Sequence, residues 1–172
     1  MSRSLASQIQ DVLPKTLDTY YNLILTVGPA RAGKTAALAE LAAKHKWPRV
    51  NVSLSLAEQL LGLTHRQRAV RAAGILDDII SISAQNSEVV LLDNIELLFA
   101  TELAQDPLKL LQSLSRNRAI VAAWPGDFEG ATLTYAVPGH PEARRYPAPQ
   151  AVIVRAGAGE QQDVRAVRRE TK

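Results

Sequence analysis

The feature that most constrains the fold is an eight-residue stretch, Gly-Pro-Ala-Arg-Ala-Gly-Lys-Thr at positions 28–35, which lies between two segments of different pattern. Residues 22–27 before it form an apolar run of strand length, and residues 36–43 after it are strong helix formers. The pattern G-x-x-x-x-G-K-[ST] binds phosphate when it joins a strand directly to a helix in this way. The stretch therefore predicts a phosphate-binding loop in an α/β domain.

Each residue type in this loop has a chemical reason. Gly28 and Gly33 allow backbone angles that a side chain would block, and they let the main chain approach a phosphate closely. Amides at the start of the following helix point at the anion, and the helix dipole adds to the attraction. Lys34 supplies a cation to the β- and γ-phosphates, and the Thr35 hydroxyl binds magnesium. The expected nucleotide-binding set is Gly28, Pro29, Ala30, Arg31, Ala32, Gly33, Lys34, Thr35 and Ala36.

A second motif is an apolar run at residues 88–92 that ends in Asp93 and resembles the Walker B strand of P-loop ATPases. Ligands in open α/β sheets bind at the carboxyl ends of the strands. An aspartate there can reach the magnesium held at the loop of a neighbouring strand. We therefore predict that Thr35 and Asp93 are the magnesium ligands, although a helix cap is the alternative role for Asp93.

Hydrolysis also needs a group that orients and activates water. Related P-loop ATPases often carry a glutamate directly after the Walker B aspartate, whereas this chain has Asn94. The nearest acid is Glu96, which is either the catalytic base or a helix cap. The predicted catalytic set is Lys34, Asp93 and Glu96, and we expect slow turnover unless a partner or self-association completes the site.

Two groups of basic residues could either bind a ligand or simply be solvent-exposed. Arg116 and Arg118 precede an apolar run at 119–123, and an arginine near a subunit boundary can act as an arginine finger. The cations between His65 and Arg71 have helical spacing and would contact the phosphate backbone in a DNA-binding subunit. Most such arginines before a strand are simply hydrated or paired with surface acids, and a hydrated helical face is the commoner explanation for the cations between His65 and Arg71. A formal net charge of +3 is too small to favour nucleic acid by itself.

Length and composition place these motifs in one domain. A chain of 172 residues with 47% hydrophobic residues is long enough for one substantial core and too short for two ordinary domains. The chain has no cysteine, and its first apolar run is too short to span a bilayer, so we expect a soluble cytoplasmic protein without a membrane partner. We divide it into an N-terminal amphipathic segment at 1–18, a P-loop nucleotide-binding domain at 19–155 and a flexible tail at 156–172.

The remaining pattern alternates between strands and helices. Strands are predicted at 22–27, 49–54, 88–92 and 119–123, with weaker candidates at 132–136 and 151–154. Helices are predicted at 4–13, 36–43, 56–84 with interruptions at Gly62 and Gly74, 95–99 and 107–114. This alternation predicts the α/β class, a P-loop NTPase fold with a central parallel sheet flanked by helices on both faces.

Several motifs taken together resemble one family. They are Gly28–Thr35, Leu92–Phe99, Asp106–Gln112, Leu114–Arg118, Leu133–Ala136 and Pro138–Glu142. In this combination the chain is similar to the BrxF family, the small P-loop proteins of type III BREX bacteriophage-defence systems. The resemblance implies a bacterial cytoplasmic protein that works beside larger BREX components, including a DNA methyltransferase, a phosphatase-like protein and a helicase. One difference is Pro125 after Trp124, where the resemblance leads us to expect an asparagine.

Three functions follow from these motifs. The first is an ATPase, with ATP and Mg²⁺ as cofactors and Glu96 orienting the attacking water. The second is a nucleotide-dependent interaction module, in which ATP binding orders a surface for a larger partner and Asn94 reflects weak hydrolysis. The third is a DNA-binding accessory subunit. The expected partners are accordingly other BREX components, a second copy of the chain, and DNA bound directly or through those components. The guanine-specifying pattern Asn-Lys-x-Asp is missing from the sequence, which favours ATP over GTP.

Overall fold

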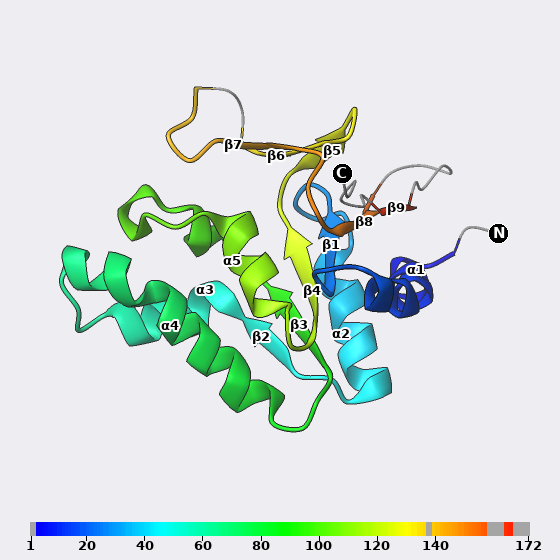
Figure 1. Cartoon of the computed structure of the whole chain (residues 1–172), viewed down its shortest axis with the longest axis horizontal. Helices are drawn as coiled ribbons and strands as arrows, with labels where there is room; N and C mark the ends of the chain where they lie inside the picture. Colours follow the sequence, from blue (N-terminus) through cyan, green and yellow to red (C-terminus); the bar gives the residue numbers. More distant parts are fainter. Residues whose placement is uncertain (1–2, 137–138, 158–163, 167–172) are drawn as a thin grey trace.

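A six-stranded sheet with helices on both faces forms the body of the protein (Figure 1). The computed structural model describes residues 3–136, 139–157 and 164–166. The strand order is β2 (Arg49–Asn51), β3 (Val89–Asp93), β4 (Ala119–Trp124), β1 (Leu23–Val27), β8 (Val152–Arg155) and β9 (Val164–Ala166). All neighbouring pairs are parallel except β8 and β9, which are antiparallel. The predicted α/β class with a central parallel sheet is confirmed.

The two faces of the sheet carry separate hydrophobic cores. Successive side chains of β1 alternate between them, with Leu23 and Leu25 in one core and Ile24 in the other. The helices α1 (Leu5–Val12) and α2 (Lys34–His45) cover one face. The opposite face is covered by α3 (Val52–Leu60), α4 (His65–Ala84), α5 (Pro107–Leu114) and the short 3₁₀ helices η2 (Glu96–Phe99) and η3 (Thr101–Leu103). A further 3₁₀ helix, η1 (Leu13–Asp18), follows α1. Because both faces are covered, β1 and β3 are buried along their whole length.

A second, three-stranded antiparallel sheet lies beyond the carboxyl end of β4 (Figure 1). It consists of β5 (Asp127–Glu129), β6 (Thr132–Tyr135) and β7 (Arg144–Pro147). Aromatic contacts join it to the main body: the ring of Phe99 stacks on that of Tyr135 with centroids 3.7 Å apart, and the indole of Trp124 donates to the Thr134 carbonyl at 3.0 Å. The sequence predicts a strand at 132–136 but not this separate sheet.

Helix caps explain two boundaries. Asp106 accepts a hydrogen bond from the Lys109 amide at 3.1 Å, with Pro107 in the first turn, so α5 begins where the sequence predicts. The strand predicted at 49–54 is wrong beyond Asn51, because the Asn51 side chain accepts from the Leu54 amide at 3.1 Å and starts α3. A capping side chain thus converts the second half of the predicted strand into a helix.

Two further expectations differ from the structure. Gly74 does not interrupt the helical segment, since α4 continues through it, whereas Gly62 does fall between α3 and α4. Within the segment 156–172, predicted to be a flexible tail, residues 164–166 form β9, which pairs with β8. Residues 158–163 and 167–172 of that tail, and Pro138 of the proline-rich loop, lie outside the described residues.

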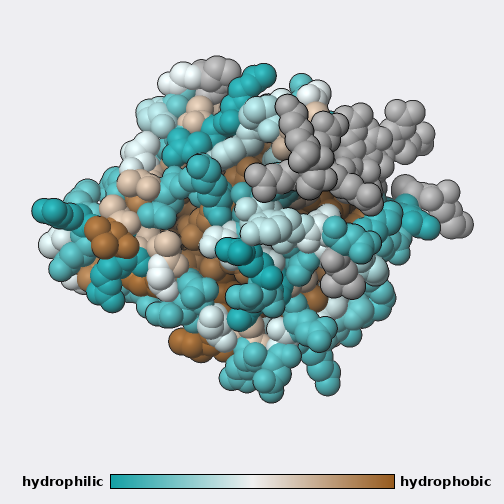
Figure 2. Space-filling view, in the orientation of Figure 1, coloured by the Kyte–Doolittle hydropathy of each residue, from teal (hydrophilic) through white to brown (hydrophobic). Residues whose placement is uncertain are grey.

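The outer surface carries scattered apolar side chains. Hydrophilic side chains cover most of the outline in Figure 2, and the hydrophobic ones that project at its left and lower edges are separate from one another. The large hydrophobic residues with the greatest exposure are Tyr20, Leu54, Leu61, Val70 and Ile82. Single exposed apolar residues are common on folded proteins. None of the helices in the described part of the chain has the length and apolar character needed to cross a membrane.

Two glycine substitutions should change stability in opposite directions. A Cβ at Gly126 would lie 1.9 Å from the Thr134 carbonyl oxygen, so Gly126→Ala should lower the free energy of unfolding by about 3 kcal/mol, the upper end for overpacking. A Cβ at Gly74 meets nothing within 4 Å inside α4, so Gly74→Ala should raise it by about 0.5–1 kcal/mol. Urea titrations would measure both, and a Gly126→Ala midpoint equal to that of wild type would contradict the packing described here.

Candidate functional site

The predicted phosphate-binding loop connects β1 to α2 at the carboxyl edge of the sheet. Gly33 has a left-handed φ of +94°, directly before the first residue of α2, and a Cβ there would meet nothing within 4 Å. Arg31 also has a positive φ, of +64°. The first amides of a helix have no partner within the helix, so those of Gly33 to Thr35 are available to an anion.

The side chain of Lys34 lies inside the loop. Its ammonium donates to the carbonyls of Gly28 and Pro29, the latter at 2.6 Å, and the residue is only 9% exposed. Burial lowers the pKa of Lys34, and the nearby carboxylates of Glu96 and Asp93 oppose this shift. Since an ammonium has three donors, two hold the loop and one is left for a ligand.

Thr35 and Asp93 meet across the sheet. The Thr35 hydroxyl donates to Asp93 Oδ1 at 3.1 Å, and the Asn94 amide donates to the same oxygen at 3.0 Å. Asp93 is buried, with 5% of its surface exposed. The Walker B pattern predicts that the strand ending in Asp93 is the neighbour of the strand before the loop. In the structure β4 lies between β3 and β1. Asp93 still reaches the start of α2 because the parallel strands end at one edge.

A cavity of about 700 Å³ opens beside this pair. Eight of the predicted site residues line it, namely Ala30, Arg31, Gly33, Lys34, Thr35, Ala36, Asp93 and Glu96. Gly28, Pro29 and Ala32 are not among its lining residues. Gly28 and Pro29 instead accept the Lys34 hydrogen bonds, and Ala32 lies against Gly157.

Arg49 is a lining residue that sequence reasoning missed. It belongs to β2, and its guanidinium lies 3.7 Å from Asp93 Oδ2. It stands in no motif, and the sequence says only that it begins a strand. Its place in the site follows from the pairing of β2 with β3, which sets Asn51 beside Asp93.

Glu96 is exposed on the cavity wall as the first residue of η2. Within the described residues its carboxylate makes no hydrogen bond to the helix start, and the Leu97 amide is instead bonded to Ser53 Oγ at 3.1 Å. Asn94 has a left-handed φ of +50°, and its carbonyl accepts from the Ser53 amide at 2.8 Å. The position directly after Asp93 therefore turns the chain so that both Asn94 and Glu96 line the cavity.

The end of β4 and the two arginines before it do not contribute a polar group to the cavity. Trp124 is fully buried, with its indole bonded to β6, and Pro125 lines the wall. Arg116 donates to the Tyr20 hydroxyl at 3.1 Å, and Arg118 points to the Ile80 carbonyl at 3.4 Å. Both arginines precede β4 and so lie at the amino edge of the sheet, opposite the loop.

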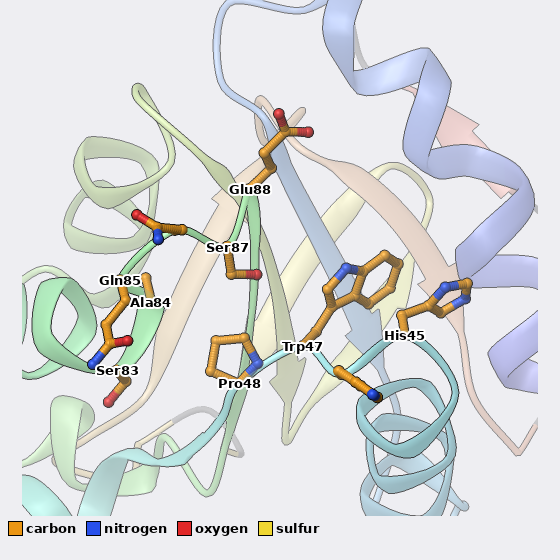
Figure 3. Close-up of a pocket in the computed structure, with 10 residues that line it drawn as sticks. His45, Trp47, Pro48, Ser83, Ala84, Gln85, Ser87 and Glu88 are labelled. Carbon is orange, nitrogen blue, oxygen red and sulfur yellow. The ribbon is translucent and has the colours of Figure 1, made fainter.

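A second hollow, of about 650 Å³, lies at that amino edge (Figure 3). Its walls come from the end of α2, the end of α4 and the start of β3, with the rings of His45 and Trp47 stacked 4.2 Å apart. Two helices end there, and the carboxyl end of a helix carries partial negative charge. The lining residues carry one acid, Glu88, and one lysine, Lys46, so the hollow lacks the group of cations and helix-start amides that lines the other cavity.

Comparisons with known proteins give one distant likeness. No family model matches the chain, and no curated protein matches it. Among solved structures, the chain is similar to AMPPCP-bound DnaA from Aquifex aeolicus, with 15% sequence identity and a TM-score of 0.41. The likeness covers 69% of this chain and 36% of the length of that one.

The desolvated Lys34 ammonium should cost the folded protein stability. Because burial lowers its pKa in the folded state, the unfolded chain holds the proton more tightly, and stability rises with pH between the lowered and the ordinary value. Lys34→Met should therefore be at least as stable as wild type at pH 7, and its advantage should shrink as the pH approaches the ordinary lysine pKa. Thermal unfolding at several pH values would measure this. A loss above about 1 kcal/mol at pH 7 would mean that the hydrogen bonds of Lys34 outweigh its desolvation.

Proposed function

We propose that this chain binds ATP with Mg²⁺ in the cavity beside the loop and hydrolyses it slowly, as a BrxF-type component of a BREX bacteriophage-defence system. The observation that carries the nucleotide proposal is the 3.1 Å contact between the Thr35 hydroxyl and Asp93, which are 58 positions apart. This contact joins the loop and the end of β3, where Asp93 lies, into one site beside the buried Lys34. The defence role depends on the family resemblance alone.

The charges around the cavity suit a triphosphate. Its lining residues include the cations Arg31, Lys34 and Arg49 and the acids Asp93 and Glu96. The free amides at the start of α2 add partial positive charge. A volume of about 700 Å³ falls in the range of small-molecule sites.

The donor set fits Mg²⁺. Thr35 and Asp93 offer oxygen atoms, and Mg²⁺ prefers one or two protein oxygens together with phosphate oxygens and water. In the described part of the chain, no group of three or more His, Cys, Asp or Glu side chains is placed to hold a metal ion by itself. When bound, the ion would neutralise charge on the β- and γ-phosphates.

Slow hydrolysis follows from the groups near the γ-phosphate end. Glu96 is the acid on the cavity wall that can orient water, but its exposed position leaves it loosely held. Asn94 takes the place directly after Asp93, and an amide cannot accept a proton. The buried Trp124 contributes no polar sensor to the cavity.

Glu96, Asn94 and Trp124 also favour a second candidate function, a nucleotide-dependent interaction module with little ATP turnover. A DNA-binding role has weaker support, because the segment 65–71 is partly engaged in the fold. Arg68 Nε lies 3.1 Å from the carbonyls of both Leu60 and Leu63, and His65 lies 3.5 Å from Glu102.

Calorimetric titration tests the binding proposal. Wild type should bind ATP and ADP in the presence of Mg²⁺, and Lys34→Ala should weaken ATP binding about 10- to 100-fold, the worth of one or two charged hydrogen bonds. Asp93→Ala should remove the effect of Mg²⁺ on affinity. The matched control is Lys44→Ala, which changes an exposed lysine near the other end of α2 that is bonded to Gln10. Equal affinities in wild type, Lys34→Ala and Lys44→Ala would contradict the proposed site.

Phosphate release separates the ATPase from the interaction module. Glu96→Gln should reduce the rate about 100-fold or more while leaving ATP affinity unchanged, because a general base contributes 10²–10⁴-fold. Glu102→Gln, an exposed acid in η3 outside the cavity lining, is the control. If wild type, Lys34→Ala and Glu96→Gln release phosphate equally, the ATPase proposal fails. The interaction module is then supported if Lys34→Ala no longer pulls down a BREX partner and Glu96→Gln still does.

A further inference from the structure

β8 lies beside β1 (Figure 1), and the chain just past its end lies against the phosphate-binding loop. Val27, the last residue of β1, pairs with Arg155, the last residue of β8. The Ala156 amide then donates to the Val27 carbonyl at 2.8 Å, which extends the pairing by one residue. Ala156 and Gly157, called the β8 extension below, therefore lie beside the start of the loop.

The β8 extension touches the loop at two glycines, one on each side of the contact. A Cβ at Gly28 would lie 2.7 Å from the Ala156 carbonyl oxygen. Conversely, a Cβ at Gly157 would lie 2.8 Å from Ala32 Cβ and 3.3 Å from Ala32 Cα. None of these atoms is the end of a flexible side chain, so the contact cannot be relieved by a rotamer change.

We propose that the β8 extension positions the phosphate-binding loop, and that Gly157 is a positioning residue of the nucleotide site although it contacts no ligand. This inference depends on the proposed nucleotide function for its consequence but not for its geometry. Ala32 directly precedes Gly33, whose amide begins the row of donors aimed at the phosphate. A side chain at position 157 would displace Ala32 and move those donors off target. The carboxyl-terminal part of the chain is thereby linked to nucleotide binding, and the link acts in both directions.

The test compares alanine at two glycines with similar backbone strain. Gly157 has φ of +72°, and Gly130, in the turn between β5 and β6, has φ of +54° but nothing within 4 Å of a Cβ. Both substitutions strain the backbone, whereas Gly157→Ala alone meets the loop. We expect Gly157→Ala to bind Mg-ATP about tenfold more weakly, the loss of one donor to a charged group, while Gly130→Ala binds as wild type does.

A rescue variant separates positioning from general damage. Ala32→Gly combined with Gly157→Ala removes the Cβ at 2.8 Å but keeps the strain at position 157. The pair should regain part of the lost affinity. If it regains none, or if Gly130→Ala loses as much affinity as Gly157→Ala, the inference is overturned.

Hydrogen exchange without nucleotide keeps the inference separate from the proposed function. The amides of residues 28 and 30–36 should exchange faster in Gly157→Ala than in wild type or Gly130→Ala. If the wild type does not bind ATP, the nucleotide proposal is refuted, and faster exchange in Gly157→Ala would still support loop positioning. Unchanged exchange, together with unchanged ATP affinity, would refute loop positioning alone. If Gly157→Ala does not fold, the wild type alone provides the test. Adding Mg-ATP should then slow hydrogen exchange at the Ala156 and Gly157 amides of the wild type, and unchanged exchange there would overturn the inference.

Discussion

The hydrogen bonds of the Lys34 ammonium to the carbonyls of its own loop hold the site in shape. A buried cation is costly unless its donors are used, and here two donors hold Gly28 and Pro29 while the third remains available. The loop is thus kept open around a positive charge before any ligand arrives. The lowered pKa of Lys34 reflects the stability that this arrangement costs.

The acid side of the site depends on the order of the strands. Asp93 can meet Thr35 because parallel strands bring their carboxyl ends to one edge, even with β4 between β1 and β3. The same edge receives Arg49 from β2 and Glu96 from η2. If the site binds ATP as proposed, its hydrolytic side is weak: Asn94 follows Asp93, Glu96 is exposed, and the Trp124 indole is bonded to the small sheet. On this proposal, the site holds a nucleotide better than it hydrolyses one.

The loop and the strands around it could be predicted from sequence because their signals are local. The positions of Gly33, Lys34 and Thr35 depend on backbone angles and spacing within one turn, and the buried strands are recognisable as apolar runs. Arg49 and Gly157 could not be predicted, since each acts on a residue far away in the sequence through a contact that only strand pairing creates. The small sheet was missed for a related reason, because Phe99 and Trp124 stabilise it from outside its own segment.

The most direct measurement is a crystal structure of the protein with Mg²⁺ and a non-hydrolysable ATP analogue. The account predicts phosphate oxygens on the amides of Gly33 to Thr35, with the metal between the Thr35 hydroxyl and Asp93. Lys34 should keep its bonds to the loop carbonyls and direct its remaining donor at the phosphates. A nucleotide bound elsewhere, or a loop that stays free of phosphate at saturating concentration, would contradict it.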